Sequence, residues 1–206
     1  MKQEINPKDT SRAYAFEMWM KSPQPMVTLV KTFDVTHLCK ISRKRGLKFN
    51  LLLCWSIGRA ASCVEEFYML PKNNKLYKYD RLGLNIIVDN IKGGISSCDV
   101  PYSDDMEKFC HDYKALTHKA STTCQNITDD DAMIIGTSAV VGTELDCIVN
   151  QYTGIFNNPF LVWARYRHHW FKTTLPISFQ FHHTQMDGSQ AARFLNELQK
   201  AVNSIR

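Results

Sequence analysis

The chain has 206 residues and a formal net charge of +5, and 44% of its residues are hydrophobic. This length is enough for one well-buried core, and no linker rich in Pro, Gly or Ser divides it, so residues 1–206 are expected to form a single domain. No apolar run approaches the length of a membrane span, and the first residues lack the apolar segment of a signal peptide. The sequence therefore predicts a cytoplasmic protein with no membrane partner.

Taken in chain order, the hydrophobic patterns predict interleaved strands and helices. Strands are expected at residues 26–33, 76–79, 84–88, 133–141, 160–167 and 175–182, with a turn at 72–75. Helices are expected at residues 49–67, from Ser103 as N-cap, and from Ser189 onward; the second has Met106, Phe109, Cys110, Tyr113 and Leu116 on one face. Regular βαβ alternation and a Gly-rich phosphate loop are both lacking. The predicted fold class is α/β (α+β), a two-layer sandwich in which a mixed β-sheet has helices packed on one face.

The seven cysteines are scattered and include no Cys-x-x-Cys pair. This distribution is typical of free thiols in a reducing compartment, so no disulfide framework and no metal site are expected.

Positive charge is concentrated in two stretches, Lys40 to Lys48 and Arg165 to Lys172. One interpretation is a solvated loop before a helix and a charged hairpin turn. The other is a pair of phosphate-binding patches, since basic clusters attract polyanions. No nucleic-acid signature accompanies either stretch, so a multiply phosphorylated cofactor is the more economical partner than a nucleic acid.

The motif His182-His183-Thr184-Gln185-Met186-Asp187-Gly188 lies where the last strand gives way to the last helix. An imidazole at a strand end is partly desolvated, which favours its neutral form, and a neutral imidazole accepts a proton. A carboxylate four residues later can rigidify the loop that holds the base. The alternative is a core histidine followed by an aspartate that serves only as helix N-cap.

This motif, together with the segment Ala192 to Gln199 that follows it, resembles the C-terminal signature of the chloramphenicol acetyltransferases. The segment Pro101-Tyr102-Ser103 with Asp105 is also shared, and the resemblance runs nearly from end to end. It implies a trimer with active sites between subunits, which moves an acetyl group from acetyl-CoA to a hydroxyl of a small acceptor such as chloramphenicol.

The resemblance also implies roles for individual residues. His183 corresponds to the general base, and Asp187 to a structural carboxylate that pairs with Arg12. Ser138 corresponds to a hydroxyl that stabilises the tetrahedral oxyanion, although a small residue tolerated in a buried strand is an equal alternative.

Lys48 and Arg165 align with residues that meet the 3′-phosphate of CoA, and Tyr166 with one beside the adenine. The positions of the acceptor pocket are occupied by Met18, Trp19, Val27 and Ile95.

Two segments depart from the family pattern. Residues 140–142 read Val-Val-Gly where the family has Leu-Pro-Trp, and Val162 replaces a threonine that helps to hold a water near the oxyanion. The altered acceptor residues, where drug-modifying members carry mostly Phe and Tyr, favour acetyl transfer more than they favour chloramphenicol itself as the acceptor.

Three other functions share part of this pattern. The core of the dihydrolipoyl acyltransferases shares the His-x-x-x-Asp-Gly theme, but its pattern usually opens Asp-His and no lipoyl domain is present. A serine hydrolase built on Ser138 is disfavoured because the second glycine of a nucleophile elbow is lacking. A ligand-binding homologue without catalysis would be expected to lose the base or its arginine, and this chain keeps both His183 and Arg12.

Overall fold

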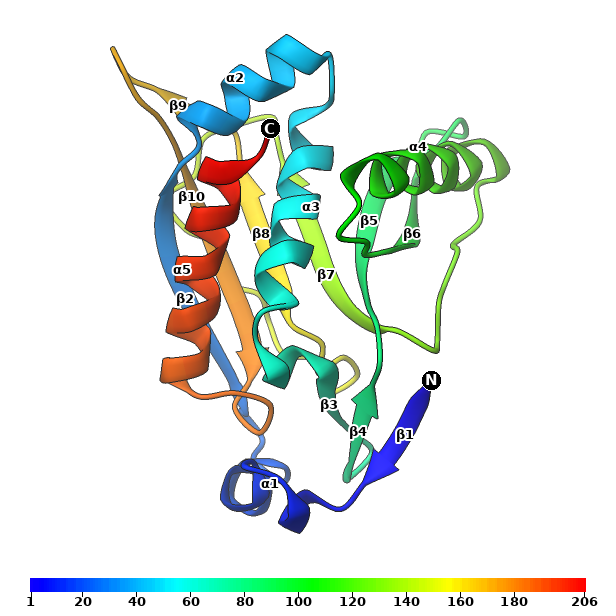
Figure 1. Cartoon of the computed structure of the whole chain (residues 1–206). Helices are drawn as coiled ribbons and strands as arrows, with labels where there is room; N and C mark the ends of the chain where they lie inside the picture. The colour runs from blue at the N-terminus through cyan, green and yellow to red at the C-terminus, as the bar shows by residue number, and fades with distance from the viewer.

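The computed structural model describes residues 1–206, which form a large mixed sheet, a smaller sheet and five α-helices (Figure 1). The large sheet has the strand order β2 (Met26–Asp34), β10 (Thr173–His182), β8 (Phe160–Ala164), β7 (Met133–Val140), β5 (Leu82–Asp89) and β6 (Ile95–Pro101), and β9 (Arg167–His168) pairs with the start of β10. Strand β7 runs parallel to both of its neighbours, whereas the other pairs are antiparallel. The predicted mixed sheet is therefore confirmed.

Helices cover one face of this sheet, as predicted (Figure 1). They are α2 (Thr36–Arg45), α3 (Phe49–Ala61), α4 (Met106–Thr123) and α5 (Gly188–Ser204). The core lies between the layers, where the aromatic rings of Phe67, Phe179 and Phe194 pack together with centroids 4.7 to 6.0 Å apart. Each fully buried phenylalanine of this kind stabilises the fold by about 1.5–3 kcal/mol. None of the helices combines the length and apolar character needed to cross a bilayer.

The smaller sheet consists of β1 (Lys2–Ile5), β4 (Lys75–Tyr79) and β3 (Met69–Lys72), and α1 (Ala13–Trp19) lies beside it. The turn expected at residues 72–75 is confirmed: Asn73 and Asn74, with φ of 54° and 60°, join β3 to β4. Asparagine tolerates this left-handed conformation better than most residues, which suits a two-residue hairpin turn.

Several predicted boundaries were wrong. Most of the basic stretch Lys40–Lys48 is helical and belongs to α2, which has no long apolar stripe. The cap of α4 is Asp105 and not Ser103, because the Asp105 carboxylate accepts hydrogen bonds from two backbone amides of the first turn, at 2.9 and 3.3 Å. The helix expected at 49–67 ends at Ala61 and is followed by a 3-10 helix at Glu65–Tyr68. The sequence patterns also missed β1, β3, β6 and α1.

Candidate active site

His183 directly follows β10 and is held from two sides. Its backbone N–H donates a hydrogen bond of 2.8 Å to the carbonyl of Pro25. Its ring stacks on the indole of Trp19, with centroids 4.6 Å apart and an interplanar angle of 3°. The side chain is 29% exposed, so the imidazole is oriented by its neighbours and still accessible to a ligand.

Arg12 holds the loop after His183 through four hydrogen bonds. Its guanidinium donates to both carboxylate oxygens of Asp187, at 2.6 and 3.0 Å, in a bidentate pair. It also donates to the backbone carbonyls of His183 and Thr184, at 2.9 and 3.0 Å. The arginine side chain is only 3% exposed, and a charge this buried is tolerated because its donors are satisfied. The structure thus brings together Arg12, His183 and Asp187.

Asp187 connects this loop to α5. Its backbone N–H donates to the side-chain oxygen of Gln190 at 3.0 Å, which closes the first turn of the helix. Hydrogen bonds from Arg12 keep the pKa of the Asp187 carboxyl below its ordinary value, so it is a carboxylate at neutral pH. One of its oxygens lies 3.0 Å from Nδ1 of His183, but this contact lacks hydrogen-bond geometry. Arg12 is therefore the main partner of Asp187, and the carboxylate acts on His183 through its charge and its loop.

His182 is fully buried beside the loop. Its Nδ1 accepts a hydrogen bond of 3.1 Å from the N–H of Thr184, whereas its Nε2 has no partner. Burial, and secondarily the neighbouring His183, lower the pKa of His182 to about 4, so its ring is neutral at pH 7. Gln185 adds a further anchor that the sequence did not reveal, because its side-chain amide donates to the carbonyls of Met69 and Glu66, at 2.5 and 3.2 Å.

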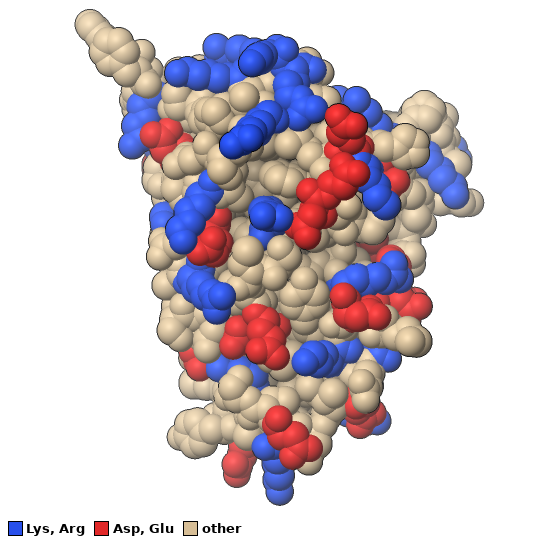
Figure 2. All heavy atoms as spheres, in the orientation of Figure 1, with Lys and Arg blue, Asp and Glu red and all other residues tan.

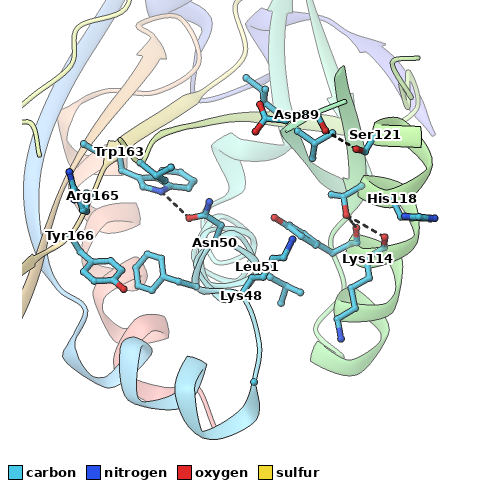
Figure 3. Close-up of a pocket in the computed structure, with 18 of the residues that line it drawn as sticks. Lys48, Asn50, Leu51, Asp89, Lys114, His118, Ser121, Trp163, Arg165 and Tyr166 are labelled. Atoms are coloured by element: carbon cyan, nitrogen blue, oxygen red, sulfur yellow. Dashed lines mark hydrogen bonds between the residues drawn. The ribbon is translucent and has the colours of Figure 1, made fainter. Parts of the chain in front are cut away.

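A second part of the candidate site is a cavity of about 1370 Å³ that brings together Lys48, Arg165 and Tyr166 (Figure 3). Lys48 is the N-cap of α3, where unpaired backbone N–H groups favour anions. Arg165 donates to the carbonyl of Gly142 at 2.6 Å, and the ring of Tyr166 lies 5.0 Å from that of Phe49. The volume exceeds the 300–1,000 Å³ typical of drug-sized ligands.

The wall of the cavity that faces Arg165 belongs to α4, which the sequence analysis did not assign to the site. Tyr113 and Lys114 line this wall. The only signal was Tyr113, which has a polar tip on an otherwise apolar helix face.

Ser138 does not lie beside His183 in the same chain. It pairs in register with Val162 of β8, and Val162 pairs with Ser178 of β10. Ser178 precedes His183 by five residues, or about 16 Å along a strand. The buried Trp163 points toward α3, so its neighbour Val162 and the residues level with it point to the face away from the helices.

The predicted acceptor residues also fall into two groups. Trp19 stacks on His183. Val27 lies at the start of β2, where it pairs with Phe181 close to His183, and Met18 is 51% exposed on α1. Ile95 is at the other end of the sheet, where it pairs with Asp89, a residue that lines the cavity. Within one chain, the predicted site is therefore divided into a His183 half and a half that holds Ser138, Ile95 and the cavity.

Comparison with known proteins points to one family. The family model described as chloramphenicol acetyltransferase matches residues 3–199. Chloramphenicol acetyltransferase 3 of Escherichia coli is 27% identical over 205 residues, which cover 96% of this chain and 95% of that protein. A solved chloramphenicol acetyltransferase structure superposes with a TM-score of 0.85 at 18% identity, covering 98% of this chain and all of the other. The cubic core of a pyruvate dehydrogenase complex shares the fold with a TM-score of 0.65 at 20% identity, covering 94% of this chain and 87% of that one.

Proposed function

Because the chain belongs to the chloramphenicol acetyltransferase family, and is thus an acyltransferase, we propose that it moves an acetyl group from acetyl-CoA to a hydroxyl of chloramphenicol or a similar small acceptor, with His183 as general base. The observation that carries this proposal is the fixed orientation of His183, which is stacked on Trp19 and bordered by the Arg12–Asp187 pair. As a cytoplasmic enzyme with this acceptor, it would confer antibiotic resistance.

The proposed chemistry uses Nε2 of His183, the ring nitrogen that does not face Asp187. The Asp187 carboxylate, 3.0 Å from Nδ1, favours a proton there and leaves Nε2 to act as base. Nε2 takes the proton of the acceptor hydroxyl as its oxygen attacks the thioester carbonyl. The tetrahedral intermediate then collapses, the C–S bond breaks, and the thiolate of CoA takes the proton from the imidazolium. Positioned proton transfer of this kind contributes about 100- to 10,000-fold in rate.

The large cavity is the proposed site of the donor. Lys48 and Arg165 would meet the 3′-phosphate of CoA, and Tyr166 would lie against its adenine. The N-terminus of α3 beside Lys48 supports this assignment, since a helix N-terminus favours a phosphate group.

The separation of Ser138 from His183 supports a homotrimer in which each site is shared by two subunits. Ser138 and Ile95 of one copy would then face His183 and Trp19 of the next, with the Ser138 hydroxyl donating to the oxyanion. The sheet face away from the helices exposes Val30, Ile87 and Val140 to between 40% and 46%, and such apolar positions suit a subunit interface.

A thiol-release assay tests the proposal. The protein is incubated with acetyl-CoA and a panel of acceptors that includes chloramphenicol, other hydroxylated compounds and dihydrolipoamide. Free CoA should appear faster than by spontaneous hydrolysis, and His183→Ala should lower this rate at least 100-fold while CoA affinity stays nearly unchanged.

The other outcomes separate the alternatives. Turnover with dihydrolipoamide alone would assign the chain to the dihydrolipoyl type of acyltransferase. Binding of CoA without turnover of any acceptor would leave a ligand-binding homologue. A low kcat is a third informative result, because Val162, which pairs with Ser138, and Gly142 both depart from the family pattern.

A further inference from the structure

Two side chains of α4 line the donor cavity without a function in the site described above. Tyr113 and Lys114 both line the cavity, and Figure 3 shows Lys114 on the side that faces Arg165. Within the chain, neither the hydroxyl of Tyr113 nor the ammonium of Lys114 has a hydrogen-bond or ion-pair partner. Both groups are donors, so this wall offers two unused donors to a ligand.

The side chain of Tyr113 is held in place by the protein core. The residue is 7% exposed, and its ring packs against Phe109 with centroids 6.2 Å apart. Its hydroxyl has no hydrogen-bond partner, yet it keeps some accessible surface, and the residue lines the cavity. Burial raises the pKa of the Tyr113 hydroxyl, so it stays an O–H donor at any physiological pH.

Lys114 is an unpaired cation of α4 that lines the cavity. Earlier in the same helix, Lys108 pairs with Asp112 at 2.8 Å, and His111 contacts the same carboxylate at 3.2 Å. Lys114 has no carboxylate partner, so its charge is available to the cavity. Two acidic residues line the cavity. Asp89 lies at the Ser121 end of α4, about 10 Å along the helix from Lys114, and Glu144 is paired with Arg167 at 3.5 Å. An anionic ligand group is therefore favoured at the Lys114 end.

We propose that Tyr113 and Lys114 bind the 5′-diphosphate of CoA, across the cavity from Arg165, which together with Lys48 meets the 3′-phosphate. This inference rests on the proposed function, since it concerns the same co-substrate. A ligand with a single anionic group would need cationic side chains on only one wall of the cavity. Donors on two opposite walls match a ligand whose phosphates lie at two separate positions, as they do in CoA.

Truncated ligands distinguish which phosphate each residue contacts. Binding of CoA, 3′-dephospho-CoA and pantetheine is measured by calorimetry, with pantetheine in competition against CoA where its affinity is low. Tyr113→Phe should weaken CoA and 3′-dephospho-CoA by the same factor, about tenfold, because it loses a hydrogen bond to a charged group. Lys114→Gln should weaken both about threefold or more. Neither variant should change the affinity for pantetheine.

Two matched variants complete the experiment. Lys48→Gln should weaken CoA but not 3′-dephospho-CoA. Lys119→Gln removes a cation of α4 that does not line the cavity, and it should change none of the affinities. Tyr113→Phe keeps the buried ring, so the fold should be retained, as a far-ultraviolet circular dichroism spectrum would verify.

The possible failures are distinct. If wild-type protein binds no CoA, the proposed function itself is wrong. If it binds CoA and both α4 variants match wild type, α4 does not contact the diphosphate. If either variant weakens CoA alone, that residue contacts the 3′-phosphate and its assignment is overturned.

Discussion

Arg12 is the residue on which the geometry of the candidate base depends. Its guanidinium is almost fully buried, and it bonds both the Asp187 carboxylate and the backbone of the His183 loop. Removing one partner of a fully buried ion pair costs about 3–5 kcal/mol, because the other charge is left without compensation; the cost here is smaller, since the Asp187 side chain is 45% exposed. The pair is therefore a positioning device: it touches no acceptor in the proposed mechanism, yet it fixes the residues on both sides of the base.

The first prediction concerns His182 and acid. In the folded protein the pKa of His182 is lowered from 6.5 to about 4. Between these values the unfolded chain binds a proton that the folded chain excludes, so stability falls as the pH falls through this window. The loss contributed by His182 should approach about 3 kcal/mol below pH 4. Urea unfolding at a series of pH values between 7 and 4 would measure it, because linear extrapolation gives the stability in water at each pH.

His182→Asn isolates this contribution. Asparagine does not titrate, and its oxygen can accept the Thr184 N–H in place of Nδ1. The variant should lose stability more gradually with acid than wild type, whatever its stability at pH 7. His118→Asn, at an exposed position of α4, serves as the control. Equal pH slopes for wild type and His182→Asn would contradict the prediction.

The candidate site was only partly accessible from sequence. The resemblance identified Arg12, His183 and Asp187, and the structure brings these three together. The stack of Trp19 on His183 could not be foreseen, because α1 and β10 are joined by contacts between distant segments. The buried anchors made by Gln185 could not be foreseen either, since they end on backbone carbonyls, which leave no trace in a sequence.

At the scale of elements, prediction succeeded where a single periodic pattern was strong. Strand β10 alternates cleanly, and α3 is apolar on nearly every side, so both were predicted within a few residues apart from the C-terminal end of α3. Prediction failed for α2, whose buried residues are only Leu38 and Cys39 and whose last turn is basic. Figure 2 shows Lys and Arg gathered at the end of the molecule where this helix lies. Prediction failed also for β6, whose buried Asp99 is stabilised by the Asn85 side chain at 2.7 Å.

The second prediction concerns the packing of α3 on the segment before α4. A Cβ added at Gly58 would collide with the ring of Tyr102. That ring cannot move freely, because its hydroxyl donates to Asp104 at 2.6 Å and Asp104 is bound by Arg59. Alanine favours a helix by about 1 kcal/mol over glycine, but the overlap should cost more. Gly58→Ala is expected to lower the free energy of unfolding by about 1 kcal/mol or more.

A double-mutant cycle tests the cause. With Tyr102→Ala in the background the ring is gone, and Gly58→Ala should become neutral or stabilising. The unfolding free energies of the four proteins in urea would give the coupling. If Gly58→Ala were equally destabilising in both backgrounds, the Tyr102 contact would not be its cause.

At the scale of the whole molecule, the important feature is the division of the proposed site between two ends of the sheet. The register from Ser138 through Val162 to Ser178 fixes this separation, and no side-chain rearrangement within one chain can close about 16 Å. A shared site makes assembly a condition of activity.

The third prediction is complementation between inactive variants. His183→Ala and Ser138→Ala are each expected to lose at least 100-fold in kcat. When the two are mixed under conditions that exchange subunits, some sites combine an intact His183 with an intact Ser138. Random assortment in a ring should restore about a quarter of the wild-type activity per site.

The control is a mixture of either variant with itself, treated in the same way, which should stay inactive. Sedimentation of the wild type should give the mass of a trimer. A stable monomer, or no recovery in the mixture despite proven subunit exchange, would contradict a site shared between subunits.

The pairing of Arg12 with Asp187 has a consequence for how the protein is made. These residues are 175 positions apart, so the contact closes a loop that spans most of the chain. During synthesis the first helix and its arginine emerge early, but their partner Asp187 appears only after the last strand, just before α5 begins. Contacts so distant in sequence also carry the largest loop-closure entropy. We therefore expect the orientation of His183 to be fixed late in folding. A chain interrupted between His183 and Asp187 would contain every strand of both sheets without the pair that holds the histidine loop.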